Sequence, residues 1–91
     1  MTIPLNTAQK QLVETSMDLV PQMIRSMTRT SAYVSEEEQQ ELCQIGYLAL
    51  CRAAARFDKD RPFLPYARTL IRHAIFDYWR ETAREIGRAH V

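Results

Sequence analysis

Apolar side chains recur at three- and four-residue steps in three stretches of this chain, which is the spacing of helices that bury one face. The first stretch spans about residues 7–30, the second about 35–57 and the third about 65–86. Polar or charged breaks separate them. The pattern therefore predicts an all-α fold, a compact three-helix bundle in which each helix packs an apolar stripe against the others.

Local signals place the ends of these helices and one interruption. Ser35 precedes a run of glutamates, the pattern of a capped N-terminus, and Pro65 can begin the third helix because its missing N–H is not needed there. Gly87 is a stop signal, so residues 87–91 are expected to be a linker start or a frayed tail. Pro21 removes a backbone donor inside the first stretch. We therefore expect the first helix to be kinked or split near Pro21.

The second helix has a core face and an outer strip that is unusually apolar for a surface in contact with water. The core face runs at helical spacing from Leu42 to Phe57 and includes Gly46. A mid-helix glycine costs about 1 kcal/mol relative to alanine, which the close approach of another helix could offset. Either a third helix or a partner is expected to cover the opposite strip. This strip consists of Glu41, Gln44, Leu48, Cys51, Arg52 and Ala55.

One face of the third helix combines arginines with aromatic rings. Its predicted buried face holds Ala67, Leu70, Ile71, Ala74, Ile75 and Tyr78. The opposite arc collects Pro65, Arg68, Thr69, Arg72, His73, Phe76, Trp79 and Arg80. Arginines bind phosphates, and exposed rings offer flat surfaces on which an unpaired base stacks. Two interpretations stay open: the arc binds a partly melted strand, or its rings are buried under the first helix and its arginines keep the surface soluble.

The distribution of charge also points to the C-terminal part of the chain. The net charge is only +1, but residues 1–51 carry three basic against six acidic side chains, and residues 52–91 carry nine against five. Local rather than total charge decides whether a surface attracts a polyanion. Residues 52–91 are therefore the candidate for contact with nucleic acid.

Composition excludes several other classes of protein. The chain has 91 residues, 46% of them hydrophobic and only two of them glycine, which suits one helical domain over residues 1–91. A membrane-spanning run and a signal peptide are not indicated, so we expect a cytoplasmic location and no membrane partner.

Cysteine and histidine spacing argues against a metal centre or a disulfide. Cys43 and Cys51 lie about 12 Å apart along one predicted helix, too far for a bridge. His73 and His90 show no ligand spacing with them. A glycine-rich phosphate loop and a nucleophile paired with a base are also missing from the sequence. We therefore expect no metal, no cofactor and no catalytic residue.

The second and third helices contain short motifs in a characteristic order. They run from Glu41 to Leu50, then Ala53, Arg56-Phe57-Asp58, Phe63-x-x-Tyr66-Ala67, and Ile71-Arg72-x-Ala74-Ile75-x-Asp77 with Arg80. In this order and spacing they resemble conserved region two of bacterial RNA polymerase sigma factors, most closely the flagellar and sporulation type. Leu19-Val20 lies where that family has an upstream Leu-Val pair. The resemblance covers roughly residues 12–80.

The resemblance implies that the second helix docks on the clamp helices of the largest polymerase subunit. The family presents an acid, a glutamine and a following acid there, and the matching positions are Glu41, Gln44 and Ile45. The third position departs from the pattern, which could weaken docking or shift it towards an apolar contact. Leu48 and Arg52 lie on the same strip and complete the predicted polymerase-binding set.

The resemblance also implies that the third helix recognises the minus-ten promoter element and holds its non-template strand as the duplex opens. Phe63 and Tyr66 match aromatic positions that hold flipped bases, and Arg68 and Arg72 would contact the backbone. Promoter sequence would be read one turn further along. The full predicted DNA-binding set is Arg61, Phe63, Tyr66, Arg68, Thr69, Arg72, His73, Phe76 and Arg80.

Two further departures and the length of the chain leave alternatives. The loop over Lys59–Pro62 is shorter than is usual in the family, and Thr69 and Leu70 stand where primary sigma factors have paired tryptophans. These departures favour, as an alternative, a sigma-like module that binds polymerase or an anti-sigma factor without opening promoters. The third hypothesis is that the chain is a plain helical bundle and that its resemblance to sigma factors is accidental. Because sigma factors normally carry a second, helix-turn-helix domain, we expect this chain to be part of a longer protein rather than a small adapted one.

Overall fold

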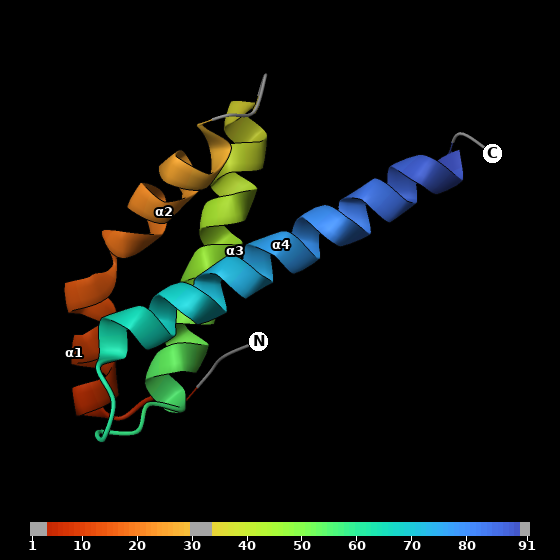
Figure 1. Ribbon diagram of the computed structural model, residues 1–91. Helices are drawn as coiled ribbons and strands as arrows, with labels where there is room; N and C mark the ends of the chain where they lie inside the picture. Colours follow the sequence, from red (N-terminus) through yellow and green to blue (C-terminus); the bar gives the residue numbers. More distant parts are fainter. Residues whose placement is uncertain (1–3, 30–33, 90–91) are drawn as a thin grey trace.

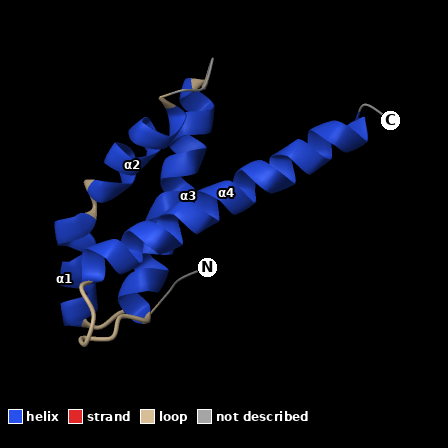
Figure 2. Cartoon of the chain, viewed as in Figure 1, coloured by secondary structure: helices blue, strands red, loops and turns tan. Residues whose placement is uncertain are grey.

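The fold is built from four α-helices. The computed structural model describes the backbone of residues 4–29 and 34–89, and the side chains of this part as far as Thr82. All regular structure in these residues is helical (Figure 2). The helices are α1 (Thr7–Ser16), α2 (Leu19–Thr28), α3 (Glu36–Ala55) and α4 (Phe63–Ala89). The predicted all-α class is therefore correct. The predicted count of three helices is wrong, because the first stretch forms two helices.

The break between α1 and α2 lies just before Pro21. Met17 and Asp18 form a turn in which the Val20 N–H donates to the Met17 carbonyl at 3.2 Å. Pro21 is the third residue of α2, within a first turn whose N–H groups have no helical partner. In an uninterrupted helix it would have faced the Met17 carbonyl with a ring instead of an N–H. We predicted a kink or a split near Pro21, and the structure shows a split.

Polar side chains cap the first and third of these helices. Asn6 precedes α1 and exchanges two hydrogen bonds with Gln9: the Gln9 N–H donates to Asn6 Oδ1 at 2.8 Å, and the Asn6 N–H donates to Gln9 Oε1 at 2.9 Å. At the start of α3 the Glu38 N–H donates to Ser35 Oγ at 3.1 Å. Each cap satisfies backbone donors that the first helical turn leaves free.

The helix ends differ from the predicted ones by a few residues. α2 ends at Thr28, and the predicted end at residue 30 lies outside the described residues. α3 ends at Ala55 rather than 57, and α4 begins at Phe63, so Pro65 is in its first turn but is not its first residue. The helix continues through Gly87 to Ala89, where we expected a stop, and residues 90–91 of the predicted tail lie outside the described part.

α3 is the central helix of the fold. It packs against α1, α2 and α4, and α4 crosses it (Figure 1). The largest fully buried side chains come from three helices and meet along α3: Val20, Leu42, Leu50, Ile71 and Ile75. Small residues fill the remaining contacts and let the helices approach closely. These are Ala49, Ala53, Ala54 and Ala67.

Gly46 marks the closest approach of the helices. A Cβ atom built on Gly46 would lie 2.6 Å from Val20 Cγ1 on α2 and 3.7 Å from Ile71 Cγ2 on α4. The glycine therefore sits where α2 and α4 both touch α3. The helical cost of glycine expected from the sequence is offset by this contact.

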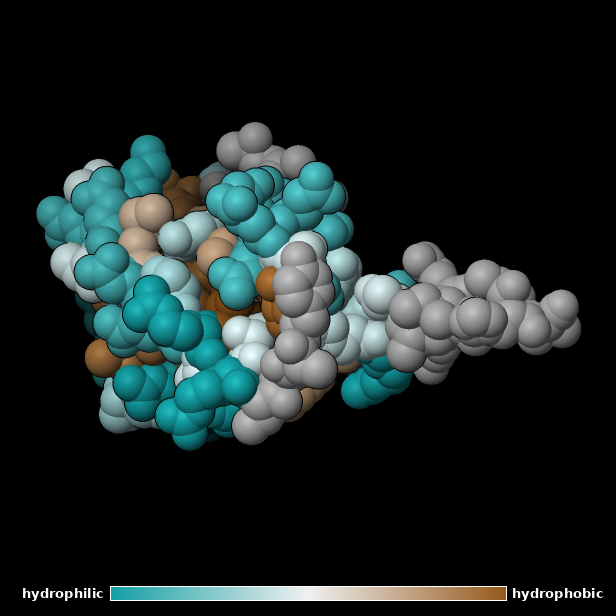
Figure 3. All heavy atoms as spheres, turned by 90° about the horizontal axis from the view of Figure 1, so that it is seen from above, coloured by the Kyte–Doolittle hydropathy of each residue, from teal (hydrophilic) through white to brown (hydrophobic). Residues whose placement is uncertain are grey.

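The molecule is elongated because α4 extends beyond the bundle. Its extents are 47 × 24 × 22 Å, and the C-terminal part of α4 projects away from the other helices (Figure 1). Seen from above, the described surface is mainly hydrophilic, with hydrophobic residues visible in smaller patches (Figure 3).

Candidate functional site

The outer strip of α3 faces solvent. Glu41, Gln44, Leu48 and Arg52 are exposed, and Ile45 is half-buried at its edge. Leu48 is 38% exposed, a large apolar side chain that none of the described helices covers. Of the two possibilities raised by the sequence, a covering helix is thus excluded within the described residues. The strip is available to a partner.

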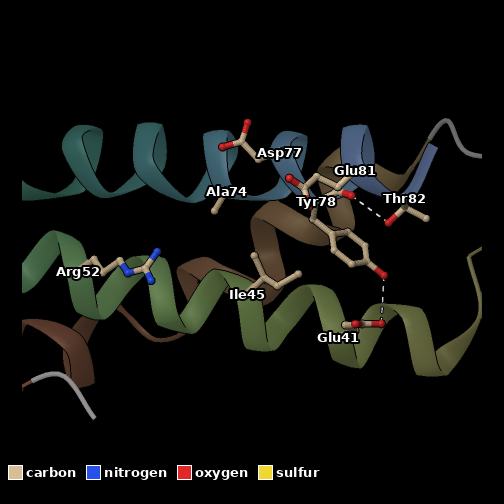
Figure 4. A pocket seen from close by; sticks show the side chains of 8 residues that line it. All are labelled: Glu41, Ile45, Arg52, Ala74, Asp77, Tyr78, Glu81 and Thr82. Carbon is tan, nitrogen blue, oxygen red and sulfur yellow. Dashed lines mark hydrogen bonds between the residues drawn. The ribbon is translucent and has the colours of Figure 1, made fainter. Parts of the chain in front are cut away.

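One edge of this strip forms a wall of a hollow between α3 and α4. The hollow has a volume of about 550 Å³. Its α3 wall consists of Glu41, Ile45 and Arg52, three of the five predicted polymerase-binding residues (Figure 4). Its α4 wall consists of Ala74, Asp77, Tyr78, Glu81 and Thr82. The predicted strip is therefore one half of a groove, which we call the α3–α4 groove.

A hydrogen bond crosses the α3–α4 groove. The Tyr78 hydroxyl donates to Glu41 Oε2 at 3.0 Å (Figure 4). Desolvation between the helices, and then this bond to Glu41, raise the pKa of Tyr78 above its ordinary value of 10.0. The tyrosine therefore stays a neutral donor, and the bond ties α4 to an acid of the strip. Sequence reasoning assigned Tyr78 to the core and missed this role, because no local signal pairs residues 41 and 78.

The outward face of α4 is basic and partly aromatic, as the helical spacing predicted. Arg68, Thr69, Arg72, His73 and Arg80 are all exposed. The Arg80 guanidinium forms an exposed ion pair with Asp77 at 3.7 Å. An exposed pair of this kind contributes little to stability and leaves the arginine free to exchange partners.

The two aromatic rings on this face are not buried under the first helices. Phe76 is 46% exposed, and its ring lies 5.9 Å from that of the half-buried Trp79, tilted by 55°. The interpretation that both rings are core residues is therefore wrong for Phe76. The exposed Phe76 ring is therefore available for contact with a ligand.

The start of α4 brings an aromatic side chain and arginines together around two hollows. A hollow of about 200 Å³ is lined by Arg56, Phe57, Asp58, Arg61 and Tyr66. A neighbouring hollow of about 400 Å³ is lined by Arg61, Pro62, Pro65, Tyr66 and Thr69. Tyr66 and Arg61 belong to both. The structure thus groups three predicted DNA-binding residues, and it adds Arg56, which sequence reasoning did not assign to the site.

Phe63 lies beneath this cluster rather than on its surface. It is only 9% exposed, and its ring packs edge-on against Phe57 with the ring centroids 5.2 Å apart. A ring in this position has little surface for a base. It instead supports the adjoining loop, in which the Asp60 N–H donates to Asp58 Oδ1 and the Arg61 N–H donates to the Asp58 carbonyl, both at 3.1 Å.

The two predicted sets of residues meet at a further, smaller hollow. Its volume is about 190 Å³, and Arg52 of the polymerase set and His73 of the DNA set both line it, together with Arg56 and Asp77. The two outward surfaces are therefore adjacent, and α3 and α4 form one continuous surface. Along their contact, carboxylates gather near Tyr78 and cationic side chains near Arg56.

The described residues contain no group of three or more histidine, cysteine or acidic side chains placed to hold a metal ion. Cys43 and Cys51 are both half-buried free thiols. A helix with the length and apolarity needed to cross a membrane is not found in this part of the chain.

Comparison with known proteins identifies the family. No curated protein and no solved structure matches the chain. The family profile described as Sigma-70 region 2 matches residues 12–85, which include α2, α3 and the described side chains of α4. This match agrees with the exposed strip on α3 and the basic, aromatic face on α4. The chain belongs to the Sigma-70 region 2 family, the non-enzymatic, DNA-binding and polymerase-binding domain of sigma factors in transcription initiation.

Proposed function

We propose that this domain docks on the clamp helices of RNA polymerase through the α3 strip, and that α4 and the preceding loop recognise the minus-ten promoter element. The observation that carries the proposal is the exposure of Leu48 beside Gln44, an apolar contact flanked by polar groups on the surface of a sigma region-two domain. Promoter DNA and polymerase both lie in the bacterial cytoplasm, where the domain would act.

Docking through α3 follows from the chemistry of the strip. A half-buried Ile45 and an exposed Leu48 offer apolar area, while Glu41, Gln44 and Arg52 offer hydrogen bonds and charge around it. Protein interfaces commonly combine an apolar centre with a polar rim. The strip meets this description over about three turns of a single rigid helix.

Recognition of an opened strand follows from the arrangement at the start of α4. Tyr66 lies between two hollows beside Arg61, so a base stacked there would have its phosphate near a guanidinium. Arg68 and Arg72 continue the exposed basic face, and Phe76 offers a second ring further along. We assign Phe63 to the support of this surface, since its ring is buried.

A crossed pair of variants tests both surfaces. Gln44→Ala with Leu48→Ala should reduce binding to bacterial core RNA polymerase at least about tenfold, since the few central residues that dominate an interface contribute more than about 1 kcal/mol each. It should leave binding to a single-stranded minus-ten oligonucleotide unchanged. Arg72→Ala should weaken binding to the oligonucleotide and leave binding to polymerase unchanged. Because one phosphate contact is lost, the slope of log affinity against log salt concentration should also become less steep by about 0.7.

Two results would contradict the assignment. Unchanged polymerase binding by the α3 double variant would show that the strip is not the docking surface. Equal oligonucleotide binding by the wild type and Arg72→Ala would show that the outward face of α4 does not hold the strand.

Docking without promoter opening is the alternative function. The short loop before α4 favours it, as do Thr69 and the half-buried Leu70 at the family's tryptophan positions. In that case an anti-sigma factor is a further possible partner. Transcription from a promoter duplex with core polymerase separates the two functions, because a docking module binds polymerase but yields no promoter-dependent transcript.

A further inference from the structure

The α3–α4 groove extends the proposed docking strip onto a second helix. Glu41 and Arg52 of the strip, and Ile45 at its edge, form the α3 wall, so a polymerase segment seated on α3 would lie against α4 as well. The resemblance to the family implies polymerase contacts only for residues of α3. The residues of the α4 wall are therefore additional candidates for contact.

The charge of the groove defines the kind of side chain that fits it. Three carboxylates, Glu41, Asp77 and Glu81, line it against the single guanidinium of Arg52. The Asp77 carboxylate points away from α3 (Figure 4) and pairs with Arg80. Glu41 on one wall and Glu81 on the other are thus the remaining acids that line the groove, which favours a cation as its ligand.

Ile45 gives the groove an apolar floor where the family pattern has an acid. It is half-buried and packs against the core, directly beside the Ala74 side of α4. The same groove holds Glu81 on its opposite wall (Figure 4). A carboxylate is thus present in the same hollow, but it comes from α4 instead of α3.

We propose that the α3–α4 groove receives an arginine or lysine side chain of the polymerase segment that docks on α3, and that Glu81 supplies the carboxylate that Ile45 lacks. This inference rests on the proposed polymerase docking. The Tyr78 hydroxyl, held at 3.0 Å from Glu41, keeps the α3 acid at the mouth of the groove and leaves the floor to the aliphatic stem of the incoming side chain.

The test measures binding of the full 91-residue chain to purified bacterial core RNA polymerase at low salt. Glu81→Gln should weaken binding about threefold to fivefold, the range expected for one exposed charge pair. Adding Ile45→Glu, which restores an acid to α3, should return the affinity of Glu81→Gln to the wild-type value. Glu14→Gln, the same change of charge on the exposed face of α1, is the matched control and should bind like the wild type.

The outcomes separate this inference from the proposed function. If the wild type binds polymerase and Glu81→Gln binds equally well, the contribution of α4 is overturned and docking through α3 stands. If Glu81→Gln binds weakly and Ile45→Glu fails to restore binding, Glu81 does not replace the missing acid. A wild type that does not bind polymerase would remove both proposals. Thermal unfolding followed by circular dichroism verifies that each substitution, including Ile45→Glu at its half-buried position, leaves the fold intact.

Discussion

Gly46 illustrates how a single residue connects the sequence with the packing of three helices. Its position in the middle of a helix indicated that another helix approaches closely, and the structure identifies the neighbours as Val20 on α2 and Ile71 on α4. Valine is β-branched and stiff, so its methyl group cannot easily move out of the way of a new side chain. The space at Gly46 is therefore fixed by α2.

Gly46→Ala should lower the free energy of unfolding by about 1–2 kcal/mol, because overpacking costs more than the roughly 1 kcal/mol of helix propensity that alanine adds. Urea unfolding of the isolated chain measures the change. In a Val20→Ala background the same substitution should cost less, since the methyl group that lies 2.6 Å from the new Cβ is then absent. Equal costs in both backgrounds would contradict this account.

The aromatic residues show where reasoning about single residues succeeds and where it fails. The helical wheel placed Phe76 on the outward face of α4, where it is 46% exposed. It could not place Phe63, which lies at the start of α4 and is buried against Phe57 from the end of α3. Tyr78 lies on the predicted inner face, yet its hydroxyl reaches Glu41 at the mouth of a groove.

At the scale of the elements, the N-terminal stretch shows how strongly a single proline limits a helix. Apolar periodicity continues across Pro21, and it supported one helix over residues 7–30. The backbone instead turns at Met17 and Asp18 and starts again as α2, with Pro21 in its first turn. Periodicity reports which side chains share a face, so it persists when two helices in succession pack against the same neighbour.

α1 depends on its cap more than the other helices do. It has ten residues, Ser16 is its only buried side chain, and Leu12 and Val13 are half-buried against the core, so packing supports it less than it supports α3. Asn6→Ala removes the acceptor for the Gln9 N–H and should cost about 1 kcal/mol in the free energy of unfolding. Asn6→Asp keeps an acceptor at the same position and should remain within a few tenths of the wild type. Chemical denaturation measures both, and similar losses in the two variants would argue against the cap.

α3 and α4 are the elements for which periodicity was most informative. The outer strip of α3 and the outward arc of α4 were both predicted from spacing, and their polar members are exposed. What spacing left out is that the two surfaces adjoin. They meet at the hollow that Arg52 and His73 both line, and Glu81 of the α3–α4 groove was not among the residues that the sequence singled out.

At the scale of the whole molecule, α3 is the element on which the fold depends. It contacts α1, α2 and α4, and Leu42 and Leu50 on it are fully buried. A chain in which one helix supports all the others is expected to unfold in a single cooperative step. The surfaces for polymerase and for DNA would then be lost together.

Trp79, the one tryptophan of the chain, offers a test of this cooperativity. Its fluorescence reports on α4, whereas far-ultraviolet circular dichroism reports on all helices, and the two denaturation curves should coincide. Leu50→Ala on α3 should shift both curves equally, with a loss of about 2–5 kcal/mol for a fully buried leucine. A tryptophan transition that stays in place while the dichroism curve moves would show that α4 unfolds independently.

The sequence by itself determined the class of the fold, the amphipathic faces of α3 and α4 and the Ser35 cap that begins α3. These properties depend on residues within a few positions of each other, so spacing and local hydrogen bonding are sufficient to predict them. Only the tertiary structure decided the burial of Phe63, the bond between Tyr78 and Glu41, and the presence of Ile45 and Glu81 in the lining of one groove. Those features join residues that are far apart in the chain, and periodicity along one helix does not determine which helix lies opposite it or where the two cross.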